Sequence, residues 1–297
     1  MNSENVPMSR DSILSASEAL SLLERPETPN PAARNPRFAS RIAESKAAAV
    51  EAGDQEEAKR FWIAEAISHS QLIFENAFEL MKEHRFYDAW CKLEECEITI
   101  ASLERHFAVR PPDRHRIGYI RDMVERWQSL YPYKIFFSPE ILKQRVECSI
   151  CDTKVSLRNP CGHEKGQIYD GEQCYHIVTK CEFLSISAVE NPVQKYSVGF
   201  LASENGSGPR DHYDYAHPRF AIDRLASPYH GWYTEDQTRT IQQSSLSHHP
   251  PSARCPCGSG NEFGCCCKSK PEVVVPHLQF IFSVPPPPEL PQEQINI

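Results

Sequence analysis

Hydrophobic side chains recur at helical spacing through the first half of the chain, most regularly between residues 54 and 131. Apolar positions three or four residues apart form a stripe along one face of an α-helix. Three such stripes follow one another, each stopped by polar residues or proline. Their members are Ala58, Trp62, Ala66, Ile73, Phe74, Ala77, Phe78, Leu80 and Met81, then Phe86, Trp90, Leu93, Ile100, Leu103 and Phe107, then Ile117, Ile120, Val124, Trp127 and Tyr131. The pattern predicts a helical bundle, assigned to residues 54–144, with these side chains in its core.

The first 53 residues carry only short helical patterns, one over residues 11–24 and one that begins with Asn35 as N-cap and Pro36 in the first turn. The prolines between the two patterns restrict their neighbours and remove donors, which is typical of a linker. We therefore expect residues 1–53 to be weakly ordered, with short helices. Asp54 and Glu57 then have the spacing of a capping box, with Asp in place of Ser or Thr, and predict the start of a longer helix.

Short apolar alternations and turn residues replace the helical period from residue 145 onward. Residues 183–189 and 193–201 flank an Asn-Pro pair and predict two strands around a turn, within an α+β region assigned to residues 145–241. Residues 242–253 are rich in Ser, His and Pro and are interpreted as a linker. Residues 271–297 contain four successive prolines and predict an extended, proline-rich tail.

Charge narrows the classes of function. The chain has 297 residues, with 32 basic and 40 acidic side chains and a net charge of −8. Residues 148–233 contain eight basic and ten acidic side chains, so a basic surface for nucleic acid is not expected there. Apolar stretches are too short to span a bilayer, and the N-terminus lacks the basic start and apolar run of a secretory signal. We expect a cytoplasmic protein that does not insert into membranes.

The twelve cysteines point to metal binding. Cytosolic thiols stay reduced, so clustered cysteines in such a chain favour metal sites over disulfides. Three cysteines lie within residues 148–161 and five within residues 255–267. Of the others, Cys91 and Cys96 fall on the predicted helices, where we expect buried thiols without a chemical role.

The first cluster combines Cys148-Ser-Ile-Cys151 with Cys161-Gly-His163. A CxxC turn places two thiolates on one ion, and a second turn with Cys and His completes the tetrahedron of a structural zinc site. The redox interpretation of CxxC requires a thioredoxin-like βαβ context, which is missing here. Cys174 remains an alternative, because it either replaces His163 as a ligand or packs beside the site.

Residues 255–267 read CPCGSGNEFGCCC and resemble the SEC-C motif found at the C-terminus of the preprotein translocase ATPase SecA and in other bacterial proteins. The resemblance implies a zinc site with Cys255, Cys257, Cys266 and Cys267 as ligands, and Cys265 allows a shifted register. A segment this short buries too little surface to fold alone, so metal binding must supply its folding free energy. The competing interpretation is a disordered cysteine-rich tail.

The chain around the first cluster also resembles an uncharacterised group of bacterial proteins. The similarity rests on the strings YPYKIFFSPEILKQRVECSICDTKVSLRNPCGHEKGQIYDGEQC, EFLSISAVENPVQKYSV and DHYDY, within about residues 60–268. It implies a helical region, a zinc-finger-like segment and a C-terminal SEC-C motif, without an established reaction. The expected fold is therefore α+β, with an N-terminal helical bundle, a zinc-ribbon-like β region and a small SEC-C zinc hook at residues 254–270.

Two functional hypotheses follow. Two closed zinc sites favour a protein-interaction or adaptor module, for which the SEC-C resemblance implies docking to proteins such as the chaperone SecB or to ribosomes. The lysines usual in that motif are replaced here by residues such as Asn261 and Glu262. The alternative is a metal-dependent enzyme that uses the polar stretch from Asp211 to His217, which also suits an ordinary aromatic loop. No nucleophile elbow, HExxH or phosphate-binding glycine loop supports an enzyme.

Overall fold

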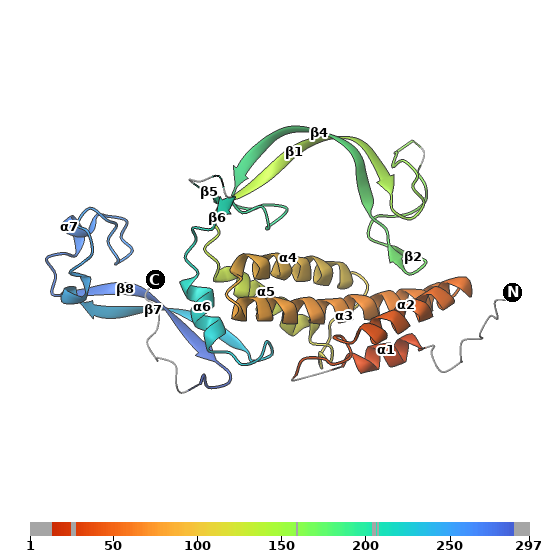
Figure 1. Ribbon diagram of the computed structural model, residues 1–297, viewed down its shortest axis with the longest axis horizontal. Helices are drawn as coiled ribbons and strands as arrows, with labels where there is room; N and C mark the ends of the chain where they lie inside the picture. The colour runs from red at the N-terminus through yellow and green to blue at the C-terminus, as the bar shows by residue number, and fades with distance from the viewer. Residues whose placement is uncertain (1–13, 25–27, 159, 204–205, 207, 288–297) are drawn as a thin grey trace. The chain divides into compact units, whose positions relative to one another are not determined.

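The computed structural model describes residues 14–24, 28–158, 160–203, 206 and 208–287 (Figure 1). These residues form helices and small antiparallel sheets, which confirms the predicted α+β class. The chain divides into two compact units, Met1–Asp214 and Tyr215–Ile297. Each unit contains one of the two cysteine clusters.

Five helices make up the first part of unit Met1–Asp214, and α3 packs against the four others. They are α1 (Ala16–Leu22), α2 (Pro36–Glu51), α3 (Gln55–Lys82), α4 (Phe86–Leu103) and α5 (Ile117–Ser129). Most of the predicted apolar stripes are buried, including Phe74, Leu93 and Trp127. Trp62 and Ala66 were assigned to this core by their spacing, but they lie only half-buried on the side of α3, because Phe61 and Ile67 face the core instead.

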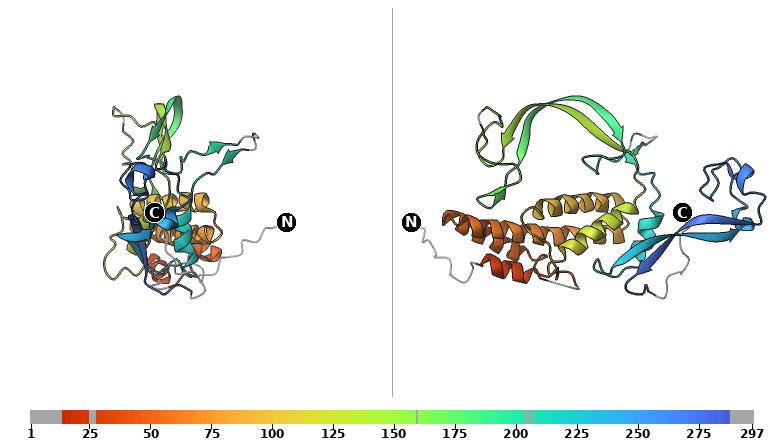
Figure 2. Two further views of the ribbon diagram at one scale, coloured as in Figure 1. Left: turned by 90° about the vertical axis from the view of Figure 1, so that its left-hand side faces the viewer. Right: turned by 180° about the vertical axis from the view of Figure 1, so that it is seen from behind.

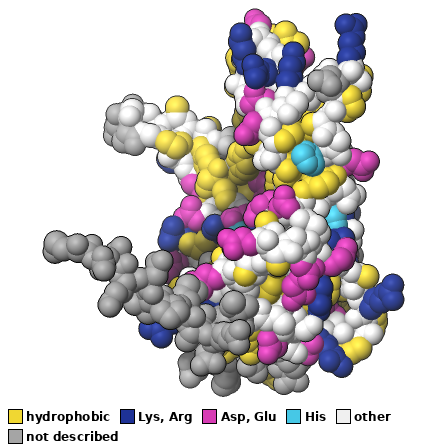
Figure 3. All heavy atoms as spheres, turned by 90° about the vertical axis from the view of Figure 1, so that its right-hand side faces the viewer, with side chains coloured by type: hydrophobic (Ala, Val, Ile, Leu, Met, Phe, Trp, Pro, Cys, Tyr) yellow, Lys and Arg dark blue, Asp and Glu magenta, His cyan; other side chains and the backbone are white. Residues whose placement is uncertain are grey.

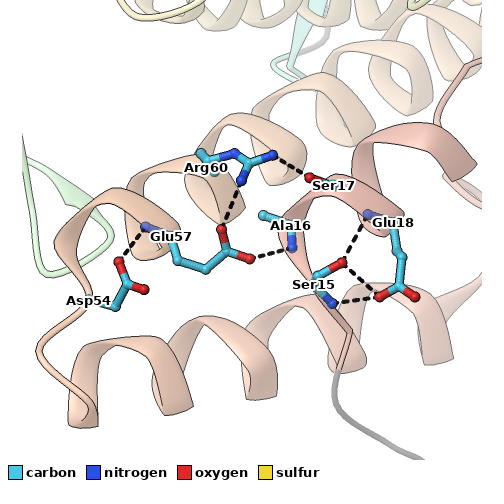
Figure 4. Close-up of polar contacts among 7 residues, drawn as sticks. All are labelled: Ser15, Ala16, Ser17, Glu18, Asp54, Glu57 and Arg60. Carbon is cyan, nitrogen blue, oxygen red and sulfur yellow. Dashed lines mark hydrogen bonds and ion pairs between the residues drawn. The ribbon is translucent and has the colours of Figure 1, made fainter.

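The start of α3 is held as the sequence predicts, but only in part. The Glu57 backbone N–H donates to Asp54 Oδ1 at 3.0 Å, so Asp54 is the N-cap. Glu57 does not close the other half of a capping box. Its carboxylate instead accepts from the backbone N–H of Ala16 at 2.7 Å and from Arg60 (Figure 4). The Glu57 carboxylate therefore fastens the first turn of α1 to α3.

The expectation of weak order in residues 1–53 is wrong for the described part of that segment; residues 1–13 and 25–27 lie outside it. Helix α2 begins at its predicted N-cap, Asn35, whose side chain accepts from Arg37 N–H at 3.0 Å. Ala16, Phe38 and Ile42 are buried. In the proline-rich stretch, Asn30 is fully buried and its N–H donates to Glu75. These helices are ordered because their apolar faces have α3 to cover them.

A long antiparallel ribbon follows the helices, made of β1 (Phe136–Cys148) and β4 (His176–Val189). Its register shifts between Glu140 and Ile141, between Lys143 and Arg145, and between Arg145 and Val146. Such bulges bend and twist a strand pair. The ribbon accordingly curves as an arch over the helices (Figures 1 and 2).

The ribbon corrects two expectations. The helical bundle was assigned as far as residue 144, but β1 already begins at Phe136. The predicted strand over 183–189 belongs to β4, yet it pairs with β1 and not with residues 193–201. That segment is held against α4 instead, since Trp90 Nε1 donates to the Lys195 carbonyl at 2.7 Å and Glu94 accepts from the Lys195 N–H.

Two short strand pairs complete this unit. They are β2 (Ile168–Tyr169) with β3 (Glu172–Gln173), and β5 (Leu201–Ala202) with β6 (Pro209–Arg210). The β2–β3 turn is fastened to the helices by polar contacts. Lys46 Nζ lies 2.7 Å from Glu172, and His106 Nε2 lies 2.7 Å from the Gly166 carbonyl oxygen. Both ends of the arched ribbon therefore rest on the helices.

Unit Tyr215–Ile297 is built on one hairpin. Strand β7 (Trp232–Gln242) pairs with β8 (Glu272–Phe282) without a register shift, from Trp232 opposite Phe282 to Gln242 opposite Glu272. Between them lie the 3-10 helix η2 (Gln243–Leu246) and the short helix α7 (Phe263–Cys266), and α6 (Ala216–Asp223) precedes the hairpin. The second cysteine cluster is thus carried in the connection of a hairpin.

The extended tail predicted for residues 271–297 is therefore wrong over Glu272–Phe282; residues 288–297 lie outside the described part. Val273 and Val275 alternate on the buried face of β8 and pack with Cys255, Phe263 and Cys267. Leu246, from the stretch interpreted as a linker, packs against the same cluster. The cysteine turn thus shares a core with the hairpin, although residues 254–270 were assigned as a separate small zinc hook.

Charged side chains are mixed over the surface. On the face drawn in Figure 3, Lys and Arg side chains lie in separate groups with acidic side chains between them. Across the part of the chain that the structure describes, no helix combines the length and apolar character needed to cross a membrane.

Candidate metal centres

The structure brings the four residues of the first predicted set together. Donor atoms of Cys148, Cys151, Cys161 and His163 all lie within 4.8 Å of one another. Cys148 ends β1, and a turn closed by Asp152 N–H on the Cys148 carbonyl at 2.9 Å presents Cys151. Cys161 and His163 come from the loop before β2. We call this group the first centre.

The spacing of the donor atoms fits a tetrahedral metal ion. Cys148 Sγ lies 3.7 Å from His163 Nδ1. With zinc–sulfur bonds of about 2.3 Å, the edge of a tetrahedron measures about 3.8 Å, and an edge to nitrogen is slightly shorter. This separation is close to such an edge, and the four donors are near enough to one another to hold one ion.

Ionisation of the thiols also suits metal binding, since the thiolate is the form that binds metal. Burial opposes ionisation of Cys148, but hydrogen bonds from the backbone N–H groups of Ile150 and Cys151, together with contacts to the thiols of Cys174 and Cys151, lower the pKa of Cys148 to about 7. Hydrogen bonds from Thr153 lower the pKa of Cys151 as well. Hydrogen bonds in and beside the Cys148–Cys151 turn therefore favour the thiolate form of both cysteines.

Cys174 is a fifth sulfur beside this centre. Its Sγ lies 3.7 Å from Cys148 Sγ and its side chain is fully buried, but it falls outside the group of four. Burial is the main reason that the pKa of Cys174 is raised to about 11. The structure thus places Cys174 against the centre, where the sequence left open whether it replaces His163 or packs nearby.

The second centre contains Cys255, Cys257, Cys266 and Cys267, whose sulfur atoms also lie within 4.8 Å of one another. Cys266 Sγ is 3.6 Å from Cys257 Sγ and 3.7 Å from Cys267 Sγ. These separations again match the edge of a zinc–sulfur tetrahedron. Four sulfur donors therefore surround a position that one metal ion can fill.

Glycine gives the second centre its tight turn. Gly258 and Gly260 have φ values of 78° and 77°, a left-handed conformation that glycine adopts without strain. A Cβ at Gly258 would also lie 3.3 Å from the ring of Pro276. Helix α7 then brings Cys266 back to the turn, which explains why the motif needs glycines between its two cysteine pairs.

Ser259 contacts the cysteines of the second centre, and the spacing of the cysteines did not predict this contact. Its hydroxyl lies 3.2 Å from Cys266 Sγ, and its hydrogen bonds are the main cause that lowers the pKa of Cys257 to about 6. Burial instead raises the pKa of Cys255 to about 12. The signal available in the sequence was a hydroxyl two residues after a cysteine, a position that favours a side-chain-to-backbone turn.

Cys265, the alternative for a shifted register, is exposed and lies outside the group. Its thiol donates to the Glu262 carbonyl at 3.2 Å. Cys255 and Cys267 are buried, and they face Phe263 and the valines of β8. The turn therefore directs Cys266 and Cys267 toward the centre and Cys265 toward solvent.

Of the stretch considered for an enzyme, residues 211–215 form a loop, and Ala216 and His217 begin α6. Asp211 Oδ1 accepts from the Tyr213 backbone N–H at 3.0 Å, and the Tyr213 hydroxyl donates to the Gly199 carbonyl at 2.9 Å. The His212 ring lies 4.3 Å from that of Tyr213. Within the described ranges, groups of three or more donors suited to a metal ion occur at the two cysteine centres and not in this stretch.

The fold and the two centres together define an α+β protein with two cysteine-rich sites that can each hold a metal ion. Comparison of the chain with protein-family models, with curated proteins and with solved structures finds no match.

Proposed function

We propose that the protein binds two structural zinc ions and acts as a protein-interaction module. The observation that carries the proposal is that each centre supplies four protein donors within 4.8 Å of one another. A catalytic zinc keeps a coordination position for water or substrate, whereas four protein ligands close the tetrahedron. The ions would then hold the fold, and the function would lie on the surfaces that they order.

The donor chemistry supports zinc as the metal. Seven of the eight donors are thiolates and the eighth is an imidazole. Soft and borderline ligands in a tetrahedral arrangement select zinc among the common divalent ions, and calcium or magnesium would require oxygen ligands. Purified under reducing conditions, the protein should contain two zinc ions per chain by elemental analysis. One ion or none, with all cysteines intact, would contradict the proposal.

The docking surface that we propose is the exposed rim of the second centre, whose sequence resembles the SEC-C motif. Phe263 is only 1% exposed, so it stabilises the turn and does not contact a partner. The exposed residues there include Ser259, Lys268 and Lys270. The resemblance implies the chaperone SecB or the ribosome as partner, and lysines suit acidic protein or RNA surfaces.

Purified SecB and purified ribosomes are the probes that test this docking role. Lys268→Glu combined with Lys270→Glu should weaken binding without loss of zinc, because both side chains are exposed and lie outside the group of ligands. Lys154→Glu, at an exposed lysine near the first centre, is the matched control. If the wild-type chain holds two zinc ions and binds neither probe, these partners are excluded.

A further inference from the structure

A pocket of about 350 Å³ lies beside the first centre, between α3, α4 and the residue that follows Cys174. It is lined by Trp62, Glu65, Ala66, His69, Ile98, Thr99, Ser102 and Tyr175. We call it the Trp62 pocket. All of its walls belong to unit Met1–Asp214, and none of the lining residues is one of the eight proposed metal ligands.

One wall of the pocket is fixed by the first centre. The backbone N–H of Ser149, within the Cys148–Cys151 turn, donates to the Tyr175 carbonyl at 3.0 Å. The Tyr175 N–H in return donates to the Ser149 hydroxyl at 2.8 Å. The position of the Tyr175 ring therefore depends on the turn that holds two of the metal ligands.

The apolar part of the pocket is formed by the rings of Trp62 and Tyr175 and by the side chains of Ala66 and Ile98. The Trp62 ring is oriented by His106, which meets it edge-on with a distance of 5.4 Å between ring centroids. Tyr175 is 51% exposed and Ile98 is 56% exposed, although both are large apolar side chains. Aromatic faces of this kind attract cations and pack against aliphatic chains.

Glu65 lines the pocket and belongs to an ion-pair network with a net charge of −1. Lys46 Nζ lies 2.7 Å from both Glu65 and Glu172, so this network contains two carboxylates and one ammonium group. Glu95 contacts His69 at 3.3 Å and Lys92 at 2.7 Å, so a second network pairs this carboxylate with one ammonium group. Burial raises the pKa of Glu65, and the Lys46 ammonium opposes that shift because it stabilises the carboxylate. The pocket therefore offers an aromatic and acidic environment for one added cation.

We propose that the Trp62 pocket binds a basic side chain, lysine or arginine, from a partner protein. The aliphatic stem of that side chain packs on Trp62, Ala66 and Ile98, and its charge lies near the aromatic faces and Glu65. The site is separate from the rim of the second centre, and it does not depend on the docking role proposed for that rim. It does depend on the first centre, because Tyr175 is positioned by it.

Three matched peptides test the proposal on the full-length, zinc-loaded protein. Each has the sequence acetyl-Ser-Leu-X-Leu-Ser-amide, with lysine, norleucine or glutamate at X. Norleucine has a linear aliphatic side chain like that of lysine without the charge. Binding is followed by NMR through the indole N–H signal of Trp62, assigned with the Trp62→Phe variant. We expect the lysine peptide to bind about 5-fold more tightly than the norleucine peptide, and the glutamate peptide most weakly.

Two variants make the outcome specific. Glu65→Gln should abolish the preference for lysine over norleucine, because it removes the surplus charge. Glu97→Gln is the control, since Glu97 is a glutamate of α4 that lines a separate pocket together with Arg121, Gln128 and Lys195. Equal binding of the lysine and norleucine peptides to the wild type would overturn the proposal. So would an unmoved Trp62 signal with every peptide, or a Glu97→Gln variant that loses the preference as Glu65→Gln does.

Discussion

Ser259 is the largest cause that lowers the pKa of one ligand of the second centre. Hydrogen bonds from its side chain and backbone N–H are the main reason that the pKa of Cys257 falls to about 6. Because protons and metal compete for the same thiolate, a low thiol pKa extends metal binding to lower pH. Ser259 should therefore determine the pH at which the second centre releases its ion.

Ser259→Ala should release zinc from the second centre at a higher pH than the wild type. Without the hydroxyl, the pKa of Cys257 moves back up toward its ordinary value, so protons displace the metal earlier as pH falls. Release can be followed with a colour-forming chelator between about pH 8 and pH 5. The first centre is the internal reference. Unchanged release of both ions would contradict the role of Ser259.

The two candidates for the fourth ligand of the first centre make opposite predictions. His163 belongs to the group of four donors, whereas Cys174 lies against Cys148 and outside that group. His163→Ala should therefore lose the ion of the first centre, and Cys174→Ala should keep both ions. Absorption spectra of the cobalt-substituted variants distinguish a site with three sulfurs and one nitrogen from a site with four sulfurs. The reverse result would assign Cys174 as the ligand.

Spacing predicted which cysteines and histidine meet, because CxxC and CxC turns fix their thiols locally. It could not decide the role of Cys174, which reaches Cys148 only through the pairing of β1 with β4. Nor could it place Trp62, since Phe61 and Trp62 are adjacent aromatic residues and the spacing of apolar positions is compatible with either of them in the core. The role of a residue could not be predicted from the sequence where it depends on contact with a distant segment.

Helices α1 and α2 show how composition can mislead at the level of elements. The helical pattern and the Asn35 cap of α2 were visible in the sequence, but the prolines between the two helices suggested weak order. Order comes from a partner that the local sequence does not reveal, namely the face of α3 that covers Phe38 and Ile42. Most of the stability of a short helix comes from such packing.

Phe38→Ala should therefore lower the free energy of unfolding by about 3–5 kcal/mol, the range for deletion of a buried phenylalanine side chain. Phe38 is 5% exposed, whereas Leu22 at the end of α1 is 45% exposed and provides the control. Leu22→Ala should change stability by less than about 1 kcal/mol. Chemical denaturation followed by circular dichroism gives both values. Equal, small effects would mean that α2 contributes little to the fold.

The ribbon illustrates a second limit at the element level. Alternation predicted the strand over residues 183–189, but a strand does not specify its neighbour, and the nearest apolar segment was chosen. In that neighbouring segment, residues 193–201, Lys195 is hydrogen-bonded to Trp90 and Glu94 on α4, and the segment does not pair with β4. The true partner, β1, precedes β4 by a long connection that contains three of the four ligands of the first centre. A metal ion bound at the first centre would therefore also stabilise the pairing of β1 with β4.

For the whole molecule, the change from helical to strand periodicity was enough to predict an α+β chain. The division at Asp214 and Tyr215 was not predicted, because the stretch around it is aromatic and lacks the composition of a linker. The stretch from residue 242 to 253 had that composition, but Gln242 ends β7 and residues 243–253 lie inside the connection of the β7–β8 hairpin. Local composition therefore placed the boundary within the connection between β7 and β8, whereas the two units meet at Asp214 and Tyr215.

The location of the second centre within that hairpin predicts how the molecule responds to loss of one ion. Cys257→Ser removes one of four ligands, so zinc binding and the folding free energy that it supplies should be lost. Cys255, Phe263 and Cys267 share a core with Val273 and Val275, and a lone two-stranded hairpin is marginally stable. Amide hydrogen exchange should therefore accelerate at least about 100-fold through β7 and β8 as well as through the turn.

The helices of unit Met1–Asp214 provide the contrast in the same experiment. Their core consists of side chains from that unit, so exchange in α3 and α4 should stay as in the wild type when Cys257 is replaced. Cys151→Ser, which breaks the first centre, should give the opposite pattern, with faster exchange in the ribbon of β1 and β4 and unchanged exchange in β7 and β8. Acceleration confined to residues 254–270 in Cys257→Ser would mean that the turn folds independently of its hairpin. Acceleration in α3 as well would mean that the two units unfold together. Units with separate cores open separately only when neither of them stabilises the other.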